Sequence, residues 1–148
     1  MITEIISGGQ TGADRAALDV AIRNGPPHGG WCPRRRKAED GIVGDQYKLR
    51  ETPMASHLQR TEWNVRDTDG TVIFTLAGDA SGGSLRTIEF ARKHKKPCAD
   101  ISRAGNYRPE KALQRFVQEQ GISRLNVAGS LESKEPGSDG IIRIGHSL

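Results

Sequence analysis

Three glycine-rich segments are the residues in this sequence whose type and spacing point most directly to chemistry. They occupy positions 7–12 (SGGQTG), 78–83 and 129–130. Glycines let main-chain N–H groups approach a ligand closely, and the Thr11 and Ser84 hydroxyls can add side-chain donors. N–H groups gathered at a helix N-terminus suit a phosphate or a similar oxyanion. We therefore predict that the chain binds a phosphate-bearing small molecule.

Basic residues offer a second source of anion recognition. Residues 34–37 read RRRK, and Arg15 follows the first glycine segment. A guanidinium can hold two oxygens of one phosphate, which makes Arg15, Arg34 and Arg36 candidates for the ligand site. The plainer interpretation of the basic run is a solvated charged stretch. Glu39 and Asp40, beside this run, could bind an amino-bearing ring or accept a proton, but we expect them to pair with the neighbouring arginines and so order the basic loop.

Several familiar catalytic and metal-binding patterns are absent from the sequence. The glycines at 8, 9 and 12 do not fit G-x-G-x-x-G, and no Walker-type G-x-x-x-x-G-K-[ST] occurs. The four histidines show no metal spacing, and no H-E-x-x-H or Ser-His-Asp arrangement supports hydrolysis. A metal site is therefore not predicted, and Cys32 is interpreted as a small buried residue.

Alternating strands and helices must position these segments. Strands are predicted over residues 3–7, 28–31, 71–76, 98–101 and 124–128. Helices are predicted over residues 14–22, 55–65, 84–95 and 109–120, whereas residues 32–53 show no clear periodicity. In the second helix, Met54, Leu58, Thr61 and Val65 are expected to form one face. The alternation predicts an α/β, three-layer, Rossmann-like fold, with a mainly parallel sheet covered by helices on both faces, in one domain over residues 1–148.

The predicted sheet would bring the glycine segments together. Each of the three follows a predicted strand, and in a parallel sheet the segments that leave the carboxyl ends of strands emerge at one edge. Open α/β sheets bind their ligands at that edge. We therefore expect a single anion site at the carboxyl-terminal rim of the sheet.

Composition limits the classes of partner. The net charge of +4 favours an anionic partner, but aromatic residues make up only 5% and no basic stretch is interleaved with them, so nucleic acid is disfavoured. No apolar run approaches the ~20 residues of a membrane span, so no membrane partner is expected. Two cysteines and no secretory signal indicate a reducing, cytoplasmic location.

The first glycine segment and its neighbours resemble a known family. Residues 7–19, SGGQTGADRAALD, are similar to the opening motif of the molybdenum carrier family, a circularly permuted YpsA-like branch of the SLOG superfamily of Rossmann-like ligand sensors. Residues 29–33 (GGWCP), 38–41 (AEDG), 60–67 (RTEWNVRD) and 125–129 (LNVAG) also resemble its signatures. The match extends to about residue 137.

The resemblance implies a specific ligand and a mode of action. It implies a homo-oligomer, such as a tetramer, that binds molybdenum cofactor (molybdopterin) or a related nucleotide or phosphate-bearing molecule, with a molybdoenzyme as recipient. Glu62 and Asn64 would recognise the edge of a pterin or base-like ring. The full set of expected ligand-binding residues is Gly8, Gly9, Gln10, Thr11, Gly12, Asp14, Arg15, Arg34, Arg36, Glu62, Asn64, Gly82, Gly83, Ser84 and Thr87.

Two departures from the family pattern bear on function. Arg35 stands where a glycine is expected between basic residues. Residues 82–89, GGSLRTIE, only loosely resemble the GGxGTxxE loop of phosphoribohydrolase relatives, although Glu89 lies at a position like their catalytic glutamate. The mismatch favours binding over catalysis. A nucleotide-processing enzyme that uses Glu89 or Asp14, and a nucleotide sensor, stay open as alternatives.

Overall fold

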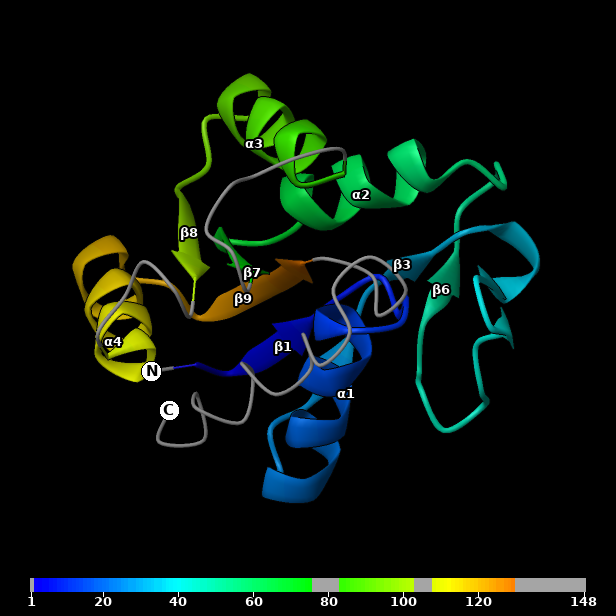
Figure 1. Cartoon of the computed structure of the whole chain (residues 1–148), viewed down its shortest axis with the longest axis horizontal. Helices are drawn as coiled ribbons and strands as arrows, with labels where there is room; N and C mark the ends of the chain where they lie inside the picture. The colour runs from blue at the N-terminus through cyan, green and yellow to red at the C-terminus, as the bar shows by residue number, and fades with distance from the viewer. Residues whose placement is uncertain (1, 76–82, 103–107, 130–148) are drawn as a thin grey trace.

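A five-stranded parallel sheet forms the centre of the molecule, with the strand order β2-β1-β9-β7-β8 (Figure 1). The computed structural model describes residues 2–75, 83–102 and 108–129. Every strand pair in this sheet is parallel. The strands are β1 (Glu4–Ile6), β2 (His28–Gly29), β7 (Gly70–Thr75), β8 (Cys98–Ser102) and β9 (Arg124–Gly129).

Helices cover both faces of the sheet, which confirms the predicted three-layer α/β fold. On one face lie α1 (Ala13–Asn24) and α4 (Pro109–Gln120), and on the other lie α2 (His57–Arg66) and α3 (Gly83–Lys93) (Figure 1). The main apolar core fills the α1–α4 side. Its buried residues are Ala13, Ala17, Val72, Phe74, Ile101, Leu113, Val117, Ile122, Leu125 and Val127. None of the helices within the described ranges has the length and apolar character needed to span a membrane.

Local signals account for the elements that agree best with the sequence. Pro109 begins α4 at a position where the missing N–H is harmless, and Gly121 ends it in the left-handed conformation (φ 62°). All six residues of β7 are buried, as expected for a continuous apolar and β-branched run covered on both faces.

The strand order places the carboxyl ends of three neighbouring strands at one edge of the sheet. β1, β9 and β7 run parallel, and each precedes a predicted ligand segment in the sequence. Residues 78–82 of the second glycine segment and Ser130 of the third lie outside the described residues. The first segment is described in full.

The aperiodic stretch between Cys32 and Pro53 packs against α1. It contains β3 (Trp31–Cys32), a single 3₁₀ turn (Arg34–Arg36), β4 (Lys37–Ala38), β5 (Gly41–Ile42) and β6 (Arg50–Glu51). β3 pairs with β6, and β4 with β5 forms an antiparallel hairpin. A second apolar cluster joins the stretch to α1 and consists of Leu18, Ala38, Val43 and Tyr47.

The predicted strand over residues 28–31 is confirmed as strand at 28–29 and at 31, but Gly30 divides it into β2 and β3. Gly30 has a φ of 137°, and a Cβ at this position would overlap the carbonyl oxygen of Ser7. The chain therefore passes against the end of β1, in a conformation that favours glycine, and then leaves the sheet.

The predicted apolar face of the second helix was wrong for Met54 and Leu58 but is confirmed for Val65. Ser56 caps α2 by accepting a hydrogen bond from the Leu58 amide (3.1 Å), so Met54 lies before the helix. Met54 and Leu58 are 56% and 48% exposed. The helix instead buries Asn64 and Val65, because it packs against α3 and β3.

Candidate functional site

The first glycine loop connects β1 to α1 in a conformation that only glycines adopt easily. Gly9 and Gly12 have φ values of 74° and 82°. A Cβ at Gly8 would lie 2.5 Å from Nη1 of Arg60, and one at Gly9 would lie 2.5 Å from Cδ1 of Leu49. A side chain at either position would therefore displace Arg60 or Leu49, and at Gly9 it would also strain the backbone.

A buried ion pair lies against this loop. Nη1 of Arg60, on α2, lies 3.3 Å from Oδ2 of Asp14, on α1, and the two side chains are only 15% and 5% exposed. The main-chain amides of Gly8 and Gln10 also donate to the Asp14 carboxylate. Two of the amides that we expected to face a ligand therefore bind the protein's own carboxylate.

Burial dominates the electrostatics of this pair. It raises the pKa of Asp14 to about 6, although Arg60 and the two loop amides stabilise the charged form. Burial likewise lowers the pKa of Arg60 from its usual value, while Asp14 opposes that change. Within the described part of the chain, Nε of Arg60 is buried and has no hydrogen-bond acceptor. The loop thus rests on a charged pair from which water is largely excluded.

The start of α1 remains suited to an anion. Its N-cap residue is Gly12, so no side chain caps the helix. The first amides of a helix carry no intrahelical bond, and the helix dipole places partial positive charge there. The amide of Gly9, by contrast, donates to Oγ of Ser7 (3.2 Å).

The β4–β5 hairpin clamps the beginning of α1 through the two acids at its turn. Thr11 Oγ1 donates to Glu39, and the Arg15 guanidinium donates to both carboxylate oxygens of Asp40. Arg15 also donates to the Gly9 carbonyl (3.1 Å). The hydrogen bond from Arg15 lowers the pKa of Asp40. The prediction that these acids hold the neighbouring arginines of the basic run was wrong for Asp40, whose partner is Arg15 from α1.

Members of the basic run have separate roles. Arg36 donates to the carbonyls of Val43 (3.0 Å), Gly44 (2.8 Å) and Tyr47 (2.9 Å), so it holds the segment that follows it. The exposed side chains of Arg34 and Lys37 form no ion pair with any described residue. The Gln10 side chain donates to the Lys37 carbonyl (2.8 Å), which places Lys37 beside the glycine loop.

Arg35 adopts the backbone conformation of a glycine. Its φ is 66° and its ψ is 16°, in the left-handed region that residues with a Cβ rarely adopt. The expectation that a glycine suits this position is therefore confirmed by the geometry. The arginine present here imposes local strain on the turn.

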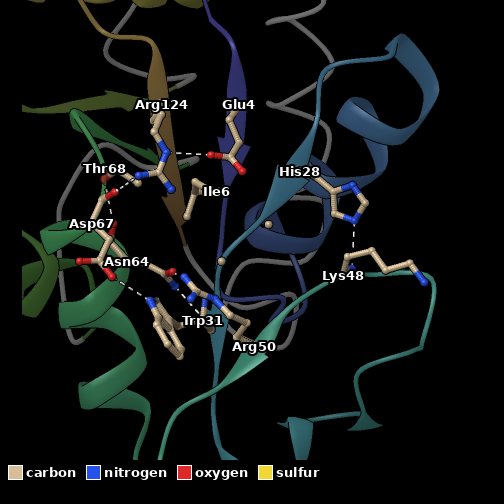
Figure 2. Close-up of a pocket in the computed structure, with 12 residues that line it drawn as sticks. Glu4, Ile6, His28, Trp31, Lys48, Arg50, Asn64, Asp67, Thr68 and Arg124 are labelled. Atoms are coloured by element: carbon tan, nitrogen blue, oxygen red, sulfur yellow. Dashed lines mark hydrogen bonds and ion pairs between the residues drawn. The ribbon is translucent and has the colours of Figure 1, made fainter.

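Glu62 and Asn64 bind other parts of the protein. Glu62 pairs with Lys93 and His94, each at 2.7 Å, and so joins α2 to α3. The Asn64 side chain accepts from the Trp31 amide (2.7 Å) and donates to the Trp31 carbonyl (2.9 Å), as Figure 2 shows. Both side chains are therefore engaged without a ligand.

The residues predicted from the second glycine segment are only partly described. Gly82 lies outside the described residues, whereas Gly83, Ser84 and Thr87 belong to the first turns of α3, with the two hydroxyl residues buried. Glu89 lies on the exposed side of α3 and pairs with Arg86 (3.2 Å), each side chain being 58% exposed. An exposed carboxylate of this kind lacks the environment that tunes a catalytic group.

No metal centre is found within the described ranges, where no three His, Cys, Asp or Glu residues come together in a suitable group. Cys32 is fully buried, which confirms its interpretation as a packed residue. Burial also raises the pKa of its thiol, so the thiolate that a soft metal would need is disfavoured.

Arg60 is the residue of this region that sequence reasoning missed. It opens the RTEWNVRD segment, and Asp14 follows the glycine loop as a lone acid. A buried carboxylate such as Asp14 needs a positive partner. That requirement is the signal that could have identified Arg60, because its segment also carries the family resemblance.

Comparisons with known proteins agree with this fold. The model of the circularly permutated YpsA SLOG family matches residues 5–142. A crystal structure described as "Putative molybdenum carrier protein", from Syntrophus aciditrophicus SB, is 44% identical in sequence and superposes with a TM-score of 0.92, covering 97% of this chain and 91% of that one. The search of curated proteins gave no match. A family model that spans nearly the whole chain establishes that this protein belongs to the circularly permutated YpsA SLOG family.

Proposed function

We propose that this protein binds and carries molybdenum cofactor, or a close relative that bears a phosphate, at the carboxyl-terminal rim of its sheet. The observation that carries the proposal is the whole-chain similarity to a protein described as a molybdenum carrier, at 44% identity. The ligand is cargo in this proposal, and no reaction is required of the protein.

The rim supports this function with a specific set of groups. The N-terminus of α1 supplies main-chain donors for a phosphate, because the N-cap residue Gly12 has no side chain that could accept from them. Lys37, held beside the loop by Gln10, and the exposed Arg34 supply positive charge. The Asp14–Arg60 pair and the Arg15–Asp40 pair fix the loop around these donors.

The same proposal covers assembly and delivery. We infer that the protein acts as a cytoplasmic homo-oligomer and passes its ligand to a molybdoenzyme. Light scattering coupled to gel filtration measures the first point, and reconstitution of a cofactor-free molybdoenzyme by the loaded carrier measures the second. A strictly monomeric chain, or an apoenzyme that stays inactive, contradicts the respective inference.

Retention of the cofactor tests the central claim. The purified chain is incubated without oxygen with cofactor released from a donor molybdoenzyme and is then separated from free ligand by gel filtration. We expect molybdenum, measured by plasma mass spectrometry, and pterin, measured by fluorescence after oxidation, to elute with the protein in equal amounts. Molybdate alone and inorganic phosphate alone serve as comparison ligands.

Two outcomes would contradict the proposal. If molybdenum and pterin elute only in the free fraction, the protein does not retain the cofactor and the proposal is contradicted. Release of free base from nucleoside monophosphates, abolished by Glu89→Ala, would instead support the enzyme alternative, in which a carboxylate assists cleavage of an N-glycosidic bond.

A further inference from the structure

A pocket of about 300 Å³ lies on the α2 side of the sheet, apart from the glycine loop. Its lining comes from β1, β2, β3, α2 and β9, and from Lys48 and Arg50 on the chain leading into and through β6 (Figure 2). Glu4 and Arg124, the first residues of β1 and β9, line its upper part in the view, whereas the glycine loop follows the other end of β1. None of residues 7–12 lines this pocket.

One wall of the pocket is held firmly in place. The Trp31 indole Nε1 donates to Asp67 (2.9 Å), and Asn64 binds the Trp31 main chain on both its amide and its carbonyl. The Arg50 guanidinium lies over the Trp31 ring, 4.0 Å from its centre (Figure 2). A ligand would therefore meet a preformed surface, which reduces the entropy lost on binding.

The charges around the pocket leave two cations without a direct ion pair. Glu4 pairs with Arg124 (2.7 Å), and Asp67 pairs with Arg66 (2.7 Å) outside the pocket. The side chains of Lys48 and Arg50 form no ion pair with any residue in the described ranges. The pocket consequently favours an anionic group at the Arg50 guanidinium, whereas the Lys48 side chain runs away from Arg50 (Figure 2).

Acceptor atoms converge at a different point of the same pocket. A Cβ placed on Gly29 would lie 3.5 Å from Oε2 of Glu4 and 3.9 Å from the carbonyl oxygen of Lys48. Glycine places no side chain between these two oxygens and Cδ1 of Ile6 (3.7 Å), and Arg124 binds only the other carboxylate oxygen, Oε1, of Glu4. A space between a carboxylate oxygen and a carbonyl oxygen suits an N–H donor and repels an anion.

We propose that this pocket is a second binding site, which takes a small molecule with both an amino group and an anionic group, of the size of an acidic amino acid. The amino group is bound by Glu4 Oε2 and the Lys48 carbonyl oxygen beside Gly29, and the anionic group is bound by the Arg50 guanidinium. The volume lies at the lower end of the range for ligand pockets, which fits a molecule of this size.

L-Glutamate is the probe, and the indole N–H of Trp31 is the reporter. The chain has two tryptophans, so their two indole signals in a ¹⁵N NMR spectrum are assigned with Trp63→Phe. We expect L-glutamate to shift the Trp31 signal with saturation, and inorganic phosphate, which has no amino group, to leave it almost unchanged.

Gly29→Ala is the decisive variant. Its added Cβ makes only ordinary contacts, so the fold is kept while the amino subsite is filled. We expect Gly29→Ala and Arg50→Gln each to weaken L-glutamate binding by about tenfold or more, as the loss of one good polar contact predicts. Arg92→Gln, which removes an exposed cation of α3 outside the pocket, serves as the matched control and should bind as the wild type does.

Three results would overturn the proposal. They are a shift that does not saturate, an equal response to L-glutamate and phosphate (an adventitious ion only), and undiminished binding by Gly29→Ala. The second site and the carrier function are tested separately. Gly9→Ala alters the glycine loop, so it should retain less cofactor but bind L-glutamate normally. A failure of L-glutamate binding therefore leaves the carrier function unaffected.

Discussion

Arg60 and Asp14 form an ion pair 3.3 Å long that is almost entirely removed from solvent. The pair connects α2 to the first turn of α1, and the guanidinium lies so close to Gly8 that no side chain fits there. The shape of the glycine loop therefore depends on a helix that is distant in the sequence.

Removal of either partner should destabilise the protein strongly. Arg60→Met and Asp14→Asn each leave an unpaired buried group, which costs about 3–5 kcal/mol. The double variant should cost less than the sum of the two, because it removes both charges. Urea unfolding measures these changes, with Arg86→Met as the control, since the exposed Arg86–Glu89 pair contributes less than about 1 kcal/mol. If the loss of stability in the double variant equals the sum of the two single losses, the two groups do not interact.

Stability should also depend on the protonation of Asp14. Its folded-state pKa of about 6 lies above the ordinary value of 3.8, so the folded protein binds this proton more tightly than the unfolded chain does. The contribution is fully present below about pH 4 and is lost as the pH rises through about 6. A shift of roughly two pKa units corresponds to about 3 kcal/mol.

The difference in unfolding free energy between wild type and Asp14→Asn isolates this effect. It should fall by about 3 kcal/mol between about pH 4 and pH 8, while the other carboxyl groups cancel. Carboxyl ¹³C NMR of the wild type reads the same titration directly if the variant is too unstable. A flat difference together with an NMR pKa near the ordinary value of 3.8 would contradict the burial argument.

Arg35→Gly should stabilise the protein by about 0.5–1 kcal/mol. The substitution relieves left-handed strain of about 1–2 kcal/mol, and the greater entropy of an unfolded glycine offsets part of the gain. The Arg35 amide keeps its hydrogen bond to Glu51, because that bond uses the main chain. Arg34→Gly is the control, since Arg34 lacks a positive φ and should lose stability. If the midpoint temperature of thermal unfolding of Arg35→Gly is equal to or lower than that of Arg34→Gly, the strain argument is contradicted.

Gly9→Ala should lower retention of molybdenum cofactor by about tenfold or more. The new Cβ meets Cδ1 of Leu49 at 2.5 Å in a left-handed conformation, so the combined clash and backbone strain should move the loop and disturb the geometry of its donors. Gly25→Ala has the same kind of φ (97°) with nothing within 4 Å, and it controls for strain alone. Equal retention by both variants would place the cofactor site away from this loop.

Local signals explain how much of the fold the sequence predicts. Helix α4 has both of its boundaries marked, by Pro109 and Gly121, and β7 is a continuous apolar run. The stretch after Cys32 has no period because its short strands are held by Arg36 and by packing on Leu18, and neither contact leaves a repeating pattern.

The site was harder to predict because its partners are distant in sequence. Asp14 and Arg60 are 46 positions apart, and Asp40 reaches Arg15 across 25. Residue type alone suggested that Arg15, Arg36 and Asn64 could meet a ligand. In the structure each of them binds the protein itself, since buried polar groups need partners close at hand.

The two hydrogen bonds between the Asn64 side chain and the Trp31 main chain also limit how copies of this chain can associate. Gly30 and Cys32 accept hydrogen bonds from the β6 side, whereas the amide and carbonyl of Trp31 point the other way and are taken by one asparagine side chain. At this residue β3 therefore offers no free main-chain edge to a strand from another molecule. Sheet extension between neighbours is blocked there, and a shared surface must be built from side chains.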